Sequence, residues 1–109
     1  MKRPSKFGNI KTVVDGIEFS SKKEARRYGE LQLLAKAGEI DGLSLQPKFP
    51  LKVNGSLVCS YIGDFQYWDR KTASDVVEDV KSEATRKNRA YRIKVKLLKA
   101  LHGISVVEV

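Results

Sequence analysis

Cysteine and histidine are almost absent from this sequence of 109 residues, in which Cys59 and His102 are the single example of each. One cysteine cannot form a disulfide within the chain, and a zinc site needs several cysteine or histidine ligands at short spacings. An internal disulfide and a zinc site of this kind are therefore both excluded. A reducing cytosol fits this composition. We expect Cys59 to be a small buried apolar group in a strand, and His102 to assist the carboxyl end of a helix.

Long apolar runs and biased low-complexity tracts are also missing. No run approaches the roughly 20 residues needed to span a bilayer, and the basic amino terminus is not followed by the apolar segment of a signal peptide. With 41% hydrophobic residues and three prolines, the composition is that of a folded protein. We expect a single domain over residues 1–109, soluble and cytoplasmic, with no membrane partner and no small-molecule cofactor.

Acidic residues are the scarcer charge, since 13 Asp and Glu stand against 21 Lys and Arg and give a formal charge of +8. Such an excess favours a polyanionic partner such as DNA, because basic side chains that neutralise phosphates release condensed counterions. The basic residues gather at the start of the chain and in the acid-free segment from Thr85 to His102: Lys2, Arg3, Lys6, Lys11, Arg86, Lys87, Arg89, Arg92, Lys94, Lys96 and Lys99. We predict that Arg86, Lys87, Arg89 and Lys94 bind nucleic acid. The alternative is a solvated charged face.

Apolar periodicity and turn residues predict an α/β domain in which helices cover a mixed central sheet. Residues 11–19 form two short apolar runs around Asp15-Gly16, the pattern of a β-hairpin. A capping box at Ser21 and a closing Gly38 predict a helix over about 21–37. Further β-rich runs cover 49–53, 57–67, 75–81 and 104–109, and a second helix covers about 85–101. After the hairpin, the predicted order is helix, three strands, helix, strand.

One β-rich run carries an acid and a lysine two positions apart. Asp79 and Lys81 project from the same face because strand side chains alternate. Asp64, on the preceding run, can lie across from Asp79 in an antiparallel pair. Hydrolysis of a phosphodiester needs a divalent ion and an oriented water, and magnesium prefers carboxylate and carbonyl oxygens. These three side chains therefore form the predicted active centre, although a bulge in the strand would bring Glu78 forward in place of Asp79.

This arrangement resembles the PD-(D/E)XK nuclease superfamily, whose motif is an acid at the end of the second core strand followed by (D/E)-X-K on the third. Here the matching residues are Asp64 and then Asp79-Val80-Lys81, with Gly63 in the place of the proline. The resemblance implies a restriction-endonuclease-like fold and a magnesium-dependent endodeoxyribonuclease, with manganese as a substitute. It also implies that Asp64, Asp79 and the Val80 carbonyl bind the ion, and that Lys81 orients the attacking water.

Three segments extend the resemblance over nearly the whole chain to a family of small phage and prophage endonuclease-like proteins: Ser21 to Tyr28, Leu45 to Leu51 and Val77 to Lys81. Such a protein would act in the bacterial host cytoplasm. Action on branched DNA or recombination intermediates is a narrower expectation by analogy, and a homodimer is compatible with the sequence. The alternative function is a non-catalytic basic DNA-binding module of a phage or prophage, and a third is a protein-interaction subunit of a phage assembly.

Glu24 and Lys94 each have two interpretations. Glu24 is the fourth residue of the Ser21 capping box, while in the nucleases that the chain resembles a glutamate of the first helix completes the metal site. We favour the catalytic role, because Glu24 shares a helical stripe with apolar residues and should face inward. Lys94 lies in the apolar stripe of the second helix. Either the aliphatic part of the Lys94 side chain is buried while its ammonium group reaches solvent, or the ammonium group points into the catalytic cleft.

Overall fold

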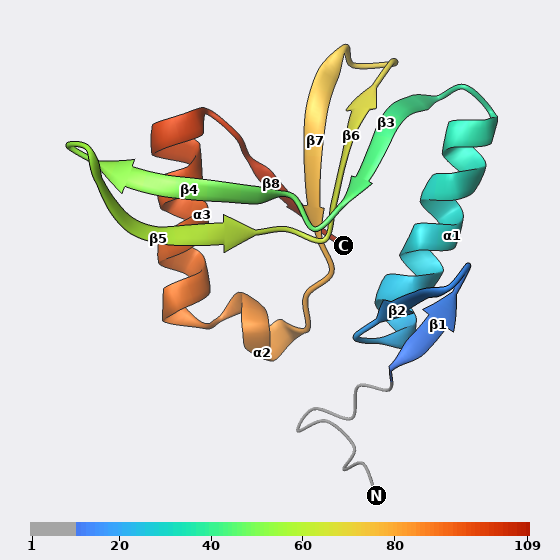
Figure 1. Cartoon of the computed structure of the whole chain (residues 1–109), viewed down its shortest axis with the longest axis horizontal. Coiled ribbons are helices and arrows are strands. Elements are labelled where there is room, and N and C mark those ends of the chain that lie inside the picture. Colours follow the sequence, from blue (N-terminus) through green and yellow to red (C-terminus); the bar gives the residue numbers. More distant parts are fainter. Residues whose placement is uncertain (1–10) are drawn as a thin grey trace, which may run out of the picture.

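The structure is a computed structural model that describes residues 11–109. The basic residues Lys2, Arg3 and Lys6 lie outside this range. A four-stranded sheet in the order β3-β6-β7-β8 forms the centre of the fold (Figure 1). Its strands are β3 (Ile40–Leu45), β6 (Phe65–Asp69), β7 (Ser74–Asp79) and β8 (Val106–Glu108). β3, β6 and β7 pair antiparallel and β8 pairs parallel to β7, so the predicted mixed sheet of an α/β domain is confirmed.

The hairpin and first helix form as their local sequence predicts. β1 (Thr12–Val14) and β2 (Ile17–Phe19) pair antiparallel, and Asp15 and Gly16 both have positive φ, 52° and 75°, as a tight hairpin turn requires. α1 (Lys22–Lys36) begins where Ser21 Oγ accepts a hydrogen bond from the Glu24 amide at 3.1 Å. Gly38 follows the helix with a φ of 77°, a conformation that glycine adopts without the steric cost of a Cβ atom.

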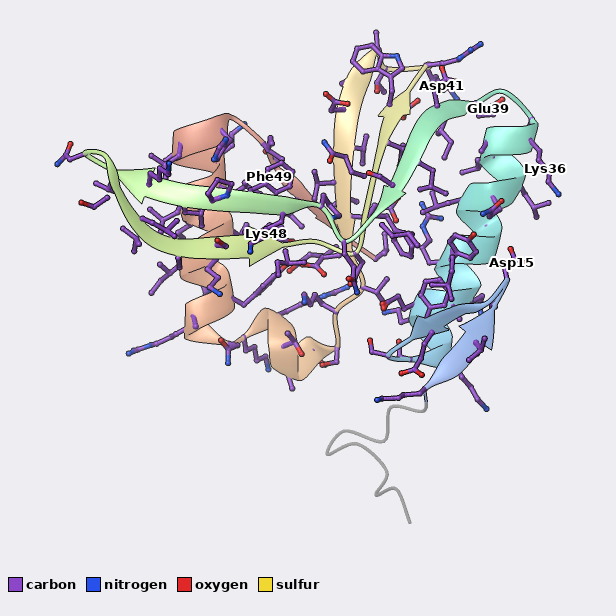
Figure 2. All side chains as sticks on the ribbon, in the orientation of Figure 1. Asp15, Lys36, Glu39, Asp41, Lys48 and Phe49 are labelled. Atoms are coloured by element: carbon purple, nitrogen blue, oxygen red, sulfur yellow. The ribbon has the colours of Figure 1, made fainter. Side chains whose placement is uncertain are left out.

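Apolar side chains fill both faces of the central sheet (Figure 2). On one face, α1 and the β1–β2 hairpin cover a cluster that includes Tyr28, Leu31 and Phe65. On the other face, a second cluster forms with α3 (Arg89–His102) and the hairpin of β4 (Lys48–Val53) and β5 (Ser56–Ile62). Its fully enclosed members are Leu51, Val77 and Leu98, each with no exposed surface. The sheet is therefore the middle layer of three (Figure 1).

His102 and Cys59, the single histidine and the single cysteine of the sequence, both lie beside the second cluster. The ring of Phe49 on β4 lies 6.0 Å from the ring of His102, and His102 Nε2 lies 2.9 Å from the Pro50 carbonyl oxygen. His102 therefore joins the end of α3 to β4, in addition to its place in the last helical turn. Cys59 is half-buried against the same cluster, as a small apolar group.

The predicted order of elements is wrong in three places. Strand β3 was not predicted, because Asp41, Gly42 and Ser44 have low strand propensity; it forms because β6 offers a pairing edge. The single run predicted over 57–67 is two strands, β5 and β6, which pair with different partners. The second helix is divided into α2 (Glu83–Arg86) and α3, because the Asn88 side chain accepts from the Tyr91 amide and starts a new helix.

In the part of the chain from residue 11 to 109, no helix combines the length and apolar character that crossing a bilayer requires.

Candidate functional site

The antiparallel ladder of β6 and β7 brings the predicted acids to one end of the sheet. Phe65 pairs with Glu78, and the ladder contains no register shift. Asp64 lies just before β6, in the break after β5, and its amide donates to the Glu78 carbonyl at 3.0 Å. The Asp64 carboxylate in turn accepts a hydrogen bond of 2.7 Å from the Val80 amide. The prediction that Asp64 lies within a strand is therefore wrong. Its backbone and its side chain both bind the end of β7 and hold it there.

Asp79 and Lys81 lie on the same face, as strand alternation predicts. The Asp79 side chain is 1% exposed, and its Oδ2 accepts a hydrogen bond from the Tyr61 hydroxyl. Lys81 Nζ lies 3.1 Å from Asp79 Oδ1 and 4.9 Å from the centre of the Tyr91 ring. Among the described residues, Oδ1 accepts no well-aligned hydrogen bond. Asp79 therefore presents a deeply buried oxygen that has a charge partner but unused hydrogen-bonding capacity.

The electrostatics of the site favour a cation. The pKa of Asp64 is raised from 3.8 to about 7, mainly by burial and then by the nearby carboxylates of Asp79 and Glu24, against the opposing hydrogen bond from the Val80 amide. Crowded carboxylates resist ionisation because their charges repel at short range. A positive ion between them would lower this repulsion and stabilise the ionised forms.

Glu24 takes part in the cap of α1 through its amide, and its role at a metal site stays a prediction. Its amide is capped by Ser21 Oγ, and its side chain, 7% exposed, accepts a 3.2 Å hydrogen bond from Ser20 Oγ. The side chain also lines a pocket of about 240 Å³, and we call this the Asp64 pocket: Ser20, Ser21, Lys23, Glu24, Asp64, Val80, Lys81, Ser82 and Thr85. Over residues 11–109, however, no three His, Cys, Asp or Glu side chains form a group that could hold a metal by themselves.

Glu78 has a structural role on the opposite face of β7. Its two carboxylate oxygens accept hydrogen bonds of 2.7 Å each from Arg27 Nε and Nη2, and Tyr67 donates a third. The side chain is 1% exposed. Because the β6–β7 register has no bulge, the alternative in which Glu78 replaces Asp79 beside Lys81 is wrong.

Gly63 is required by its surroundings. Its amide donates to the Pro47 carbonyl at 3.0 Å, a bond that proline could not make. A Cβ atom at this position would lie 3.0 Å from Val77 Cγ1, which is closer than side chains normally approach. Glycine therefore allows the chain to cross Val77 immediately before Asp64.

The basic residues predicted to bind nucleic acid are near the site but differ in environment. Arg86 and Lys87 are exposed and make weak ion pairs, with Glu108 at 3.9 Å and Glu83 at 3.8 Å. Arg89 is exposed at the start of α3. Lys94 is half-buried and lines a second pocket together with Asp79 and Lys81, which agrees with the cleft interpretation of this residue.

The sequence did not predict a role at the site for two tyrosines, Tyr61 and Tyr91. Burial and the Asp79 carboxylate raise the pKa of Tyr61 above its ordinary range, so this hydroxyl keeps its proton and remains a donor. Tyr91 donates to Glu108 at 2.7 Å, and its ring lies against Lys81. No local pattern marks these roles, because the partners lie on elements that are distant in the sequence.

The fold and the site define a small α/β domain that gathers two carboxylates and a lysine at the end of neighbouring strands. The chain belongs to a family described as Protein of unknown function (DUF1064), whose model matches residues 4–103. No curated protein and no solved structure matches the chain.

Proposed function

We propose that this chain is a magnesium-dependent endodeoxyribonuclease of the PD-(D/E)XK type. The observation that carries the proposal is the meeting of Asp64, Asp79 and Lys81 where β7 ends, with Asp79 Oδ1 buried and short of a hydrogen-bond donor. Although Lys81 supplies a charge partner, this buried oxygen has hydrogen-bonding capacity that is not used and can accept a further ligand. A divalent ion would be such a ligand.

The donor set suits magnesium, which takes oxygen ligands and keeps several of its waters. The Asp64 carboxylate, Asp79 Oδ1 and the Val80 carbonyl would hold the ion, and Glu24 faces the same pocket as Asp64. The ion would polarise a phosphate and lower the pKa of a bound water. The lysine contributes a positive charge beside the reacting phosphate and can orient the attacking water. Tyr61 and the Val80 amide keep the two carboxylates in place.

The arrangement of elements also supports the restriction-endonuclease-like fold. If the β4–β5 hairpin is set aside as an insertion, the order α1, β3, β6, β7, α3, β8 is the helix, three strands, helix, strand of that class. Asp79 then ends the third of these strands, as the motif requires, whereas Asp64 lies just before the second strand and not at its end. The formal charge of +8, with Arg86, Lys87 and Arg89 exposed beyond the site, suits a DNA substrate.

Cleavage assays with matched variants test this proposal. Labelled branched, nicked, duplex and single-stranded DNA are incubated with magnesium and the wild-type chain, Asp79→Asn or Lys81→Met. We expect cleavage of at least one substrate, with losses of roughly 100-fold or more in both variants. Asp75→Asn is the control, since Asp75 lies on the same strand and face but is exposed and outside the pockets described above. Activity that survives in Asp79→Asn would refute the assignment.

A second candidate is a non-catalytic DNA-binding module. The contacts of Asp79 favour it, because Lys81 and Tyr61 already compensate this carboxylate as they would in a purely structural cluster. Such a module would bind DNA without magnesium, and neutralising Asp64 would leave its affinity equal or higher. A nuclease would instead depend on magnesium for cleavage and lose activity in the same variant.

A further inference from the structure

A second pocket lies beside the Asp64 pocket, and the two pockets share Lys81. Lys81 lines both pockets, whereas Asp64 lines only the first and Asp79 only the second. The second pocket has a volume of about 310 Å³, and we call it the Lys94 pocket after the residue that contributes its other positive charge. Ser60 and Asn88 add polar groups to its wall.

The charges of the Lys94 pocket do not balance. It is lined by two lysines, Lys81 and Lys94, and by one acid, Asp79, which is already paired with Lys81 at 3.1 Å. Lys94 makes no ion pair with any residue from 11 to 109, although it is half-buried on the apolar stripe of α3 beside Tyr91 and Leu98. Lys94 therefore has no counter-charge among these residues, and an anion bound in the pocket would supply one.

Asn88 is also suited to an anion. Its Oδ1 accepts from the Tyr91 amide at 3.1 Å to cap α3, which leaves the NH₂ group of the side chain as a donor. A hydroxyl of Ser60 lines the same space. The pocket thus offers one uncompensated positive charge and neutral donors, the chemistry that recognises a phosphate.

We propose that the Lys94 pocket binds a second phosphate of the nucleic-acid strand, next to the phosphate that Lys81 contacts at the metal site. This inference rests on the proposed function. Lys94 holds the strand in register, and it contacts the bound DNA equally before and during cleavage. Its removal therefore weakens binding more than it slows the chemical step.

Three variants of the full chain test the role of Lys94. Lys94→Met keeps an apolar stem of similar length but removes the charge, Lys94→Arg restores a charge, and Lys96→Met removes an equal charge from the exposed face of the same helix. Binding to fluorescein-labelled duplex and single-stranded DNA is measured by anisotropy in EDTA over a range of salt concentrations. Thermal unfolding of each variant checks that the fold is intact.

We expect Lys94→Met to raise Kd roughly tenfold and to reduce the slope of log K against log salt by about 0.9 on duplex DNA. Lys94→Arg recovers most of the affinity. Lys96→Met changes Kd by less than about threefold, because salt screens the attraction between an exposed lysine and the DNA phosphates. With magnesium present, Lys94→Met raises KM while kcat stays within about twofold.

The outcomes separate this inference from the proposed function. If the wild type cleaves DNA and Lys94→Met behaves like Lys96→Met, the second phosphate site is refuted and the nuclease stands. If the wild type binds DNA but does not cut it, the nuclease is refuted, and the binding comparison still decides the role of Lys94. Failure of the wild type to bind any of the DNAs overturns both.

Discussion

Arg27 of α1 and Glu78 of β7 form an ion pair with two hydrogen bonds of 2.7 Å, from Nε to Oε1 and from Nη2 to Oε2. The hydrogen bond to Glu78 raises the pKa of Arg27 above its ordinary range, so the guanidinium stays charged. The pair holds α1 against the face of β7 that is opposite to Asp79. Since Glu24 lies one helical turn before Arg27, the same contact helps to place Glu24 beside the Asp64 pocket.

Removal of Arg27 should destabilise the fold. In Arg27→Ala, the Glu78 carboxylate would remain 1% exposed with the Tyr67 hydroxyl and no positive partner. We expect the free energy of unfolding to fall by about 3 kcal/mol, as measured by urea denaturation. Arg26→Ala, which changes an exposed arginine next to it, should shift stability by less than about 0.5 kcal/mol. Equal stabilities of the two variants would contradict a structural role for the pair.

The raised pKa of Asp64 predicts a pH-dependent stability. The folded state binds this proton more tightly than the unfolded chain, because the pKa rises from 3.8 to about 7 on folding. The stabilising contribution is therefore complete below the unfolded value and is lost as the pH rises through about 7. In EDTA, the Tm of the wild type should fall between about pH 5 and pH 8 more steeply than that of Asp64→Asn. The variant should also be the more stable of the two at the upper end of that range.

Asp75→Asn is the matched control for this pH series, because it removes an exposed carboxylate from the same sheet. Its Tm profile should follow the wild type. Profiles of Asp64→Asn and wild type that run parallel would show that Asp64 titrates at the same pH in both states.

Tyr61→Phe should weaken magnesium binding at the site while Asp64 and Asp79 stay close to their present positions. The variant leaves Asp79 Oδ2 without its buried donor, and we expect a loss of about 1 kcal/mol in stability. Because the hydroxyl orients a predicted metal ligand, the magnesium concentration for half-maximal cleavage should rise about tenfold. Tyr67→Phe removes the corresponding hydroxyl from Glu78 on the other face. That control should lose stability to a similar extent and leave the magnesium requirement unchanged.

A methyl group at position 63 should be harmful although the backbone conformation there is ordinary. In Gly63→Ala, the new Cβ would meet Val77 Cγ1 at 3.0 Å, and Val77 has no exposed surface into which it could move. We expect a loss of about 1–3 kcal/mol in the free energy of unfolding. Gly29→Ala, in the middle of α1 with nothing within 4 Å of its Cβ, should gain about 0.5–1 kcal/mol instead. A stable Gly63→Ala variant would show that the turn before Asp64 can relax.

The features that the sequence determined are those that depend on neighbouring residues. The turn at Asp15-Gly16, the capped start of α1 at Ser21 and the common face of Asp79 and Lys81 follow from backbone geometry over a few positions. These predictions are confirmed. The pairing of Asp64 with the end of β7 was also expected, although its place in a strand was wrong, because the break at Gly63 depends on contacts with Pro47 and Val77.

Only the tertiary structure excluded the bulge that would bring Glu78 forward in place of Asp79, which strand alternation favours. The contacts that hold the two acids on opposite faces are made by residues distant in the sequence: Arg27 binds Glu78 from 51 positions away, and Tyr61 binds Asp79 from 18 positions away. In the same way, β3 is a strand because β6 lies beside it, and Lys94 lines the same pocket as Asp79 because α3 packs on the β4–β5 hairpin. Such partners meet because apolar side chains from distant segments are buried together when the chain folds. The free energy of this burial depends on residues far apart in the sequence, so no single segment carries a periodic pattern that would predict the contacts.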